Sequence, residues 1–199
     1  CGIPILFPSC SKPDNGVHIF DGAAYPMEVH GFADLLPWQV KKADDTAIEL
    51  TLAPNGLTKF VYPFDFLLTM RYTLEGPTAT LALTVENTGA KVLPFSVGFH
   101  PYFSVSKLEN VSFAIDAATC SEDAKGEQPA AVQPITLTRK EGSADSIRLL
   151  TGVKTPMVMT DAGNGHKVTV AFDQDVFGKG VLWQQDAESF VCMEPWNGW

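Results

Sequence analysis

The chain has 199 residues, of which 45% are hydrophobic and 19% are charged, a composition typical of one globular domain with a substantial core. Its 14 basic and 23 acidic residues give a formal charge of -9. No run of Lys or Arg exceeds two residues, which argues against nucleic acid and anionic membranes as partners. No apolar run approaches the roughly 20 residues that cross a bilayer. We therefore expect a soluble protein with a single domain over residues 1–199.

The first third of the chain contains a long irregular segment and one short strand candidate. Residues 8–36 hold several Asn-Gly, Asp-Gly and Pro turn signals, and their aromatic content predicts an ordered, functional loop. Residues 48–52 are expected to form a strand.

The central region predicts a long antiparallel hairpin. Apolar side chains alternate with Thr and Arg over residues 66–74, and residues 79–86 repeat the alternation after a turn at Gly76-Pro77. A period of two, with β-branched and aromatic residues, is typical of strands that bury one face.

The second half predicts shorter strands separated by turns. Residues 117–133 lack an apolar face and are expected to form a surface excursion. A second hairpin is predicted at residues 157–160 and 167–172 around a glycine-rich turn. Further strands are expected at residues 111–115, 135–137, 147–150, 181–183 and 190–193. With little helical spacing in the chain, this set favours an all-β, antiparallel β-sandwich.

Two motifs hold the residue types of general acid–base catalysis. His100 lies between Phe99 and Pro101 in the run Val-Gly-Phe-His-Pro-Tyr-Phe, and Glu194 follows an apolar run and precedes Pro195. An imidazole that titrates near neutral pH and a carboxyl group in a partly apolar setting are a minimal acid–base pair.

The cysteines give no indication of a metal site. Cys1, Cys10, Cys120 and Cys192 form no Cys-x-x-Cys pair and have no close histidine, so the usual zinc spacings are absent and we expect no metal. A chain of this size needs no disulfide staples, which favours free thiols in a reducing, cytoplasmic compartment. A bridge between Cys1 and Cys10 is the alternative.

Four motifs in order give the chain a specific resemblance to a known family. They are Gly-Ile-Pro-Ile-Leu-Phe-Pro at residues 2–8, His-Gly-Phe-Ala with Leu-Pro-Trp at residues 30–38, Pro-Phe-Ser-Val-Gly-Phe-His-Pro-Tyr-Phe at residues 94–103, and Glu-Pro-Trp at residues 194–196. In this order they resemble the aldose 1-epimerase (galactose mutarotase-like) family. The resemblance implies a large antiparallel β-sandwich with a hexose, possibly phosphorylated, bound in an open cleft on one sheet.

The resemblance also implies roles for individual residues. Glu194 would take the proton from the sugar C1 hydroxyl while His100 protonates the ring oxygen, and reversal of the two roles would close the ring on the other face without a metal or redox cofactor. A glutamate whose pKa is raised by partial burial suits proton exchange in both directions. His30 resembles the second family histidine, which hydrogen-bonds the sugar.

Some positions depart from the family pattern or stay open. Relatives often carry an arginine before Gly-Ile-Pro, which here would fall at or upstream of Cys1. Asp34 stands where a basic residue is common, and its carboxylate disfavours a phosphorylated sugar. Gln184 is a candidate ligand for sugar hydroxyls because its amide both donates and accepts. The family's binding aspartate is not assigned to any one Asp. Trp38, Phe103 and Trp196 are the aromatic candidates for stacking on a sugar.

Two other function classes are compatible with the sequence. A glycoside hydrolase or lyase on a similar sandwich would need a second carboxylate beside Glu194. A sugar-binding module would bind without turnover. The oligomeric state is left open.

Overall fold

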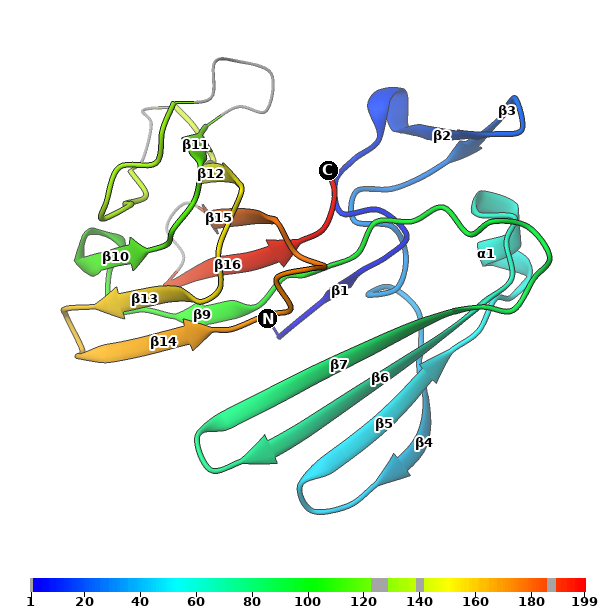
Figure 1. Ribbon diagram of the computed structural model, residues 1–199, viewed down its shortest axis with the longest axis horizontal. Coiled ribbons are helices and arrows are strands. Elements are labelled where there is room, and N and C mark those ends of the chain that lie inside the picture. The colour runs from blue at the N-terminus through cyan, green and yellow to red at the C-terminus, as the bar shows by residue number, and fades with distance from the viewer. Residues whose placement is uncertain (1, 123–128, 139–141, 186–188) are drawn as a thin grey trace. The chain divides into compact units, whose positions relative to one another are not determined.

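The computed structural model describes residues 2–122, 129–138, 142–185 and 189–199 (Figure 1). The chain divides into two compact units, one formed by Cys1–Leu6 with Ser96–Trp199 and the other by Phe7–Phe95. Both are built from antiparallel strands, which confirms the predicted all-β fold class. The single domain over residues 1–199 stays a prediction.

The first unit contains, within the described residues, a seven-stranded antiparallel sheet in the order β1-β8-β16-β15-β12-β11, with β9 also paired to β16. Its strands are β1 (Ile5–Leu6), β8 (Gly98–Phe99), β9 (Tyr102–Ser104), β11 (Thr119–Ser121), β12 (Asp145–Thr151), β15 (Lys179–Gln185) and β16 (Phe190–Trp196). The central strands β15 and β16 pair in unbroken register from Lys179 opposite Trp196 to Trp183 opposite Cys192.

A smaller sheet packs against this one and completes a sandwich within the first unit. It consists of β10 (Val111–Ala114), β13 (Met157–Asp161) and β14 (His166–Val170), and a short 3₁₀ helix, η2 (Leu108–Asn110), precedes β10. The shared core combines Phe113 and Met159 from the small sheet with Leu182, Val191 and Met193 from the large one. Both sheets therefore bury their alternate residues against each other.

Strand alternation separates the two faces of the large sheet. Because successive side chains point to opposite faces, the face with Val191 and Met193 is the core face. Cys192, Glu194 and Trp196 lie on the opposite face, which we call the Glu194 face. Cross-strand partners share a face, so Trp183, opposite Cys192, belongs to the Glu194 face as well.

The second unit contains, in its described residues, a four-stranded sheet in the order β4-β5-β6-β7 and a separate hairpin. Its elements are η1 (Asp14–Gly16), β2 (Val17–Phe20), β3 (Ala23–Pro26), β4 (Gln39–Ala43), β5 (Ala47–Leu52), α1 (Gly56–Val61), β6 (Phe66–Glu75) and β7 (Thr78–Asn87). The core includes a cluster of rings in which Phe7 contacts Phe32, Tyr62 and Phe66.

The structure also adds elements that the sequence pattern did not predict. α1 is a short helix whose start is fixed by Asn55, because the Asn55 side chain accepts from the backbone of Leu57 and Thr58 in a capping box. The β2–β3 hairpin lies inside the segment predicted to be irregular, and β11 lies inside the predicted surface excursion, of which residues 123–128 are outside the described residues. Residues 135–137 form no strand, although Ile135 bridges Phe113 and is buried.

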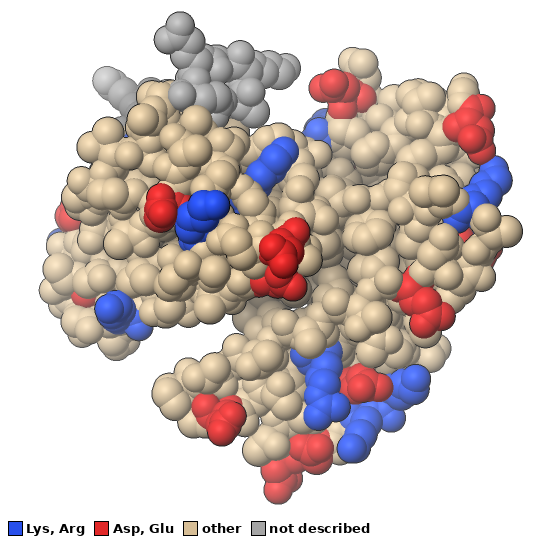
Figure 2. All heavy atoms as spheres, in the orientation of Figure 1, with Lys and Arg blue, Asp and Glu red and all other residues tan. Residues whose placement is uncertain are grey.

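On the face shown in Figure 2, basic side chains are interspersed with acidic ones. In the described parts of the chain, no helix combines the length and apolar character needed to cross a membrane.

Candidate active site

Glu194 is a fully buried carboxyl group on β16. Only 1% of the residue is exposed, and its Oε2 accepts a hydrogen bond from the indole Nε1 of Trp196 at 3.1 Å. Burial raises the pKa of Glu194 well above its ordinary value, and the bond from Trp196 offsets only part of this effect. A hydrogen bond to a charged group contributes about 1.5–3 kcal/mol, whereas burying a carboxylate costs several kcal/mol. Glu194 therefore favours its protonated form more than an exposed glutamate does.

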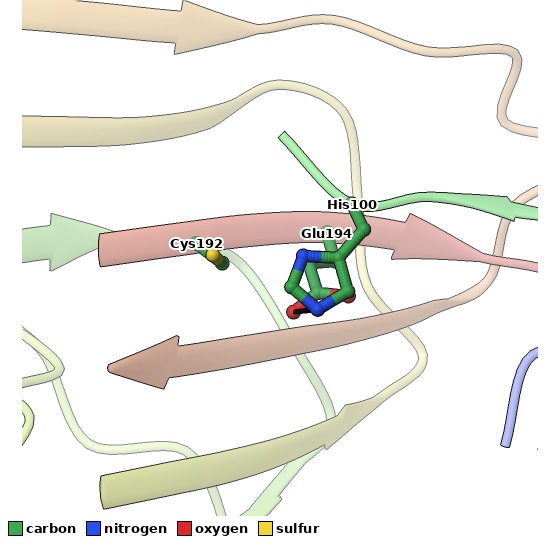
Figure 3. A group of neighbouring side chains, drawn as sticks. All are labelled: His100, Cys192 and Glu194. Carbon is green, nitrogen blue, oxygen red and sulfur yellow. Dashed lines mark ion pairs between the residues drawn. The ribbon is translucent and has the colours of Figure 1, made fainter. Parts of the chain in front are cut away.

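His100 stands directly over this carboxyl group (Figure 3). It lies in the connection between β8 and β9, where its backbone N–H donates to the carbonyl of Pro4 at 3.0 Å. Its Nε2 is 3.4 Å from Oε1 of Glu194, and the residue is 8% exposed. The imidazole stacks on the ring of Tyr102 at 4.8 Å and meets the edge of Trp183 at 5.7 Å. The two oxygens of Glu194 thus have different partners, His100 on one and Trp196 on the other.

The thiol of Cys192 lies beside His100 and Glu194, and sequence reasoning missed it. The sulfur of Cys192, a nitrogen of His100 and an oxygen of Glu194 all lie within 4.8 Å of one another. Burial raises the pKa of the Cys192 thiol, and the neighbouring Glu194 adds to this effect. The signal was available in the sequence, because residues two apart on a strand share a face.

Asp145 and Trp183 extend the Glu194 face toward β12. The indole Nε1 of Trp183 donates to Oδ2 of Asp145 at 3.1 Å, and Trp183 pairs with Ile147 on one side and Cys192 on the other. Among the described strands of the large sheet, Asp145 is the one aspartate. Sequence reasoning had left the binding aspartate unassigned, since only strand register shows which Asp shares a face with Glu194.

Gln184 is not brought together with His100 and Glu194. It lies on β15 between Trp183 and Gln185, opposite Ser146, and is 0% exposed. Alternation puts it on the same face as Leu182, which is the core face. Its amide is therefore directed away from the Glu194 face.

His30 lies in the second unit, in a strained turn. Its φ of 68° is left-handed, and its Nδ1–H donates to the carbonyl of Cys10. The next residue must be glycine, because a Cβ at Gly31 would lie 2.2 Å from the carbonyl oxygen of Phe7. Burial lowers the pKa of His30, and the bond to Cys10 and the charge of Asp34 offset part of this shift. In its neutral form His30 therefore carries its proton on Nδ1, which makes Nε2 an acceptor.

The other sequence candidates fall in varied environments. Trp196 is buried beside Glu194, and Phe103 packs against the core of the first unit. Trp38, in the second unit, donates its indole N–H to the carbonyl of Ala33 at 2.8 Å. The alternative disulfide of Cys10 involves Cys1, which is outside the described residues.

Comparisons with known proteins indicate the family and agree with this fold. The sequence matches the aldose 1-epimerase family over residues 9–198. Protein LacX of Lactococcus lactis subsp. lactis is 23% identical over 98% of this chain and 73% of its own length.

Solved structures give the same result for the fold. The Slr1438 protein of Synechocystis sp. PCC 6803 superimposes with a TM-score of 0.88 at 29% identity, over 99% of this chain and 68% of its own. A galactose mutarotase related enzyme of Lactobacillus acidophilus superimposes with a TM-score of 0.81 at 22% identity, over 98% of this chain and 71% of its own. With its fold and nearly its whole sequence matched, the chain belongs to the aldose 1-epimerase family.

Proposed function

We propose that this protein interconverts the α and β anomers of an aldohexose, with Glu194 and His100 as the base and acid. The observation that carries the proposal is the contact between Nε2 of His100 and Oε1 of Glu194 at 3.4 Å in a buried setting. Ring opening needs one group to take the proton of the C1 hydroxyl and another to protonate the ring oxygen. Both sugar oxygens are bonded to C1, so an acid and a base that lie side by side match them.

The hydrogen bond from Trp196 distinguishes the two carboxyl oxygens of Glu194. Because Trp196 donates to Oε2 of Glu194, Oε1 is the oxygen that exchanges a proton with the sugar. In the forward step Oε1 takes the proton of the C1 hydroxyl, the bond between C1 and the ring oxygen breaks, and Nε2–H of His100 donates its proton to that oxygen. Rotation about the C1–C2 bond and closure with the two roles reversed give the other anomer. Ring opening leaves Glu194 protonated and His100 without its Nε2 proton, and ring closure re-forms the C1–O bond and returns both groups to their starting states.

Neighbouring residues of the Glu194 face offer a binding surface for the sugar. Tyr102 and Trp183 border His100, and aromatic rings pack well against the C–H faces of sugars. Asp145, held by Trp183, offers a carboxylate for sugar hydroxyls. We infer that the sugar extends from the His100–Glu194 pair along Trp183 toward Asp145. His30 stays a predicted sugar ligand, and His30→Ala should weaken binding as well as rate.

The spacing of carboxylates favours an epimerase over a glycoside hydrolase. Among the described strands of the large sheet, the acidic residues are Asp145, opposite Gln185, and Glu194, opposite Val181. Four residues and two strand spacings separate their Cα atoms, a distance of about 16 Å. Glycosidase carboxylates lie about 5–9.5 Å apart, and side chains that stand perpendicular to a sheet do not close such a gap.

Asp34 and the net charge of -9 favour a neutral sugar as the substrate. We expect kcat/KM for glucose to equal or exceed that for glucose 6-phosphate, because carboxylates repel the phosphate dianion. A preference of a hundredfold or so for the phosphate, about 2.7 kcal/mol, would contradict this expectation.

The proposed reaction is tested by NMR exchange between the α and β C1 protons of glucose, galactose and their 6-phosphates. We expect the protein to accelerate exchange for at least one neutral hexose above the protein-free rate, and Glu194→Gln to reduce the acceleration by roughly 10²-fold or more. Sugar binding without any acceleration would identify a binding module instead.

A further inference from the structure

The His100, Cys192 and Glu194 side chains form a cluster with the composition of a three-ligand metal site. Figure 3 shows the imidazole over the carboxyl group, with the sulfur of Cys192 nearby on the same strand. Their ligand atoms lie within 4.8 Å of one another, and all three residues are buried. This combination of one nitrogen, one sulfur and one oxygen is more specific than an exposed acidic cluster.

The distances are close to those that a tetrahedral ion requires. Zn²⁺ bonds of about 2.0 Å to nitrogen and oxygen and about 2.3 Å to sulfur place the ligand atoms about 3.3–3.5 Å apart. The contact from His100 to Glu194 already has this length, at 3.4 Å. The sulfur of Cys192 lies within 4.8 Å of the other two ligand atoms and would have to move closer to them to bind the same ion.

The scaffold holds these ligands on rigid elements. Cys192 and Glu194 stand two residues apart on the central strand β16, which is paired on both sides. His100 is anchored by its backbone bond to Pro4 and by its stacking on Tyr102. A site built on paired strands loses little conformational entropy when an ion binds.

We propose that His100, Cys192 and Glu194 bind a thiophilic divalent cation such as Zn²⁺, with water as the fourth ligand, and that the bound ion inhibits the protein. A thiolate ligand selects Zn²⁺ or Cd²⁺ over Mg²⁺ and Ca²⁺. The ion would occupy Nε2 of His100 and an oxygen of Glu194, so neither group could exchange a proton with a sugar. The inhibition rests on the proposed epimerase function, whereas binding of the ion does not.

Binding is tested on the metal-stripped full chain by titration with Cd²⁺. We expect a thiolate-to-cadmium charge-transfer absorption in the ultraviolet that saturates at one ion per chain. Cys192→Ala should remove it, while the matched variants Cys10→Ala and Cys120→Ala should keep it. Glu194→Gln, which retains the thiol, should keep the absorption but weaken the affinity at least tenfold. Saturation at one ion in Cys192→Ala, or the lack of any absorption in the wild type, would overturn the proposal.

Inhibition is tested separately with Zn²⁺ in the anomer-exchange assay. We expect the Zn²⁺ concentration for half-inhibition to rise at least tenfold in Cys192→Ala relative to Cys120→Ala, each compared with its own metal-free rate. Equal inhibition of the two variants would overturn the inhibitory site. If the metal-free protein shows no turnover, the proposed function fails, and the Cd²⁺ titration still decides whether the site exists.

Discussion

In the described residues of the first unit, two acidic residues have almost no exposed surface, Glu194 on β16 and Asp161 at the end of β13, and the pKa values of their carboxyl groups shift in opposite directions. Burial raises the pKa of Glu194 well above its ordinary value. Burial alone would also raise the pKa of Asp161, but hydrogen bonds from Ser106, Gly163 and Asn164 outweigh it and lower the pKa. One carboxyl group therefore favours its proton and the other favours its charge, although neither residue is exposed.

The two sites differ in the number of hydrogen-bond donors that they provide to the carboxyl group. Asp161 accepts from the backbone and hydroxyl of Ser106, both at 2.6 Å, and from the backbone of Gly163 at 2.8 Å. This turn requires glycine at position 163, because a Cβ on Gly163 would lie 2.2 Å from the Ser106 hydroxyl oxygen. Glu194 accepts a hydrogen bond from the indole of Trp196 on one oxygen, and Nε2 of His100 lies 3.4 Å from the other. The donors around Asp161 stabilise its charged form. Around Glu194 the donors do not offset the effect of burial, so the protonated form is favoured.

The largest effect is expected when the exchangeable carboxyl group becomes an amide. Glu194→Gln removes the base and should lower kcat by roughly 10²-fold or more, with sugar affinity within a few-fold of the wild type. The matched change Asp161→Asn should leave kcat per folded molecule near normal. The exchange assay measures both, and circular dichroism reports the folded fraction. Near-normal turnover of folded Glu194→Gln would show that the base lies elsewhere.

Substitution of His100, the partner of Glu194, should lower kcat by a similar factor. His100→Asn keeps some hydrogen bonding but removes the proton carrier, so kcat should fall by roughly 10²-fold. His166→Asn, an exposed histidine in the first unit, is the control and should keep the wild-type rate. A normal kcat in folded His100→Asn would separate His100 from the chemistry.

A smaller effect is expected from removing the indole N–H that donates to Glu194. Trp196→Phe keeps an aromatic ring but loses the bond to Oε2, so the pKa of Glu194 should rise further. A bond of about 1.5–3 kcal/mol to a charged group corresponds to about 1–2 pKa units. The acid limb of the kcat profile should therefore shift to higher pH by about that amount, whereas Trp38→Phe should not shift it. An unshifted limb in Trp196→Phe would show that the indole does not tune the base.

The smallest effects concern stability, and their signs should be opposite. The folded state holds the Glu194 proton more tightly than the unfolded state, so its contribution is lost as pH rises above the ordinary value of 4.5. Glu194→Gln should thus gain stability over the wild type with increasing pH, by at most about 1.4 kcal/mol per pH unit. Asp161 favours its charged form, so its contribution is present above the ordinary value of 3.8 and is lost as pH falls through its lowered pKa.

Thermal melts at several pH values check these signs. Asp161→Asn should be less stable than the wild type at pH 7, and this deficit should shrink in acid. The same trend with pH in both variants would contradict the comparison.

Much of the strand architecture could be predicted from the local sequence pattern. Which residues lie beside His100 and Glu194 could not be predicted in this way. The 66–86 hairpin follows from strict alternation around Gly76, and its prediction is confirmed by β6 and β7. His100 and Glu194 are 94 positions apart in the sequence. They were identified as candidates from the motifs around them, because no periodicity of the sequence relates them. The face of Gln184 depends on strand register, which one sequence does not reveal. α1 was missed because six residues are too few for a helical period, and its signal is the Asn55 cap.

The central claim is that Glu194 holds a proton under conditions in which Asp161 is charged, and carboxyl ¹³C NMR tests it most directly. The protein would be labelled at the side-chain carboxyl carbons of Glu and Asp, with Glu194→Gln and Asp161→Asn used to assign the two signals. We predict that Glu194 titrates well above 4.5 and Asp161 below 3.8. A Glu194 signal that titrates at or below its ordinary value would contradict the account, because the carboxyl group would then be a fixed charge like Asp161.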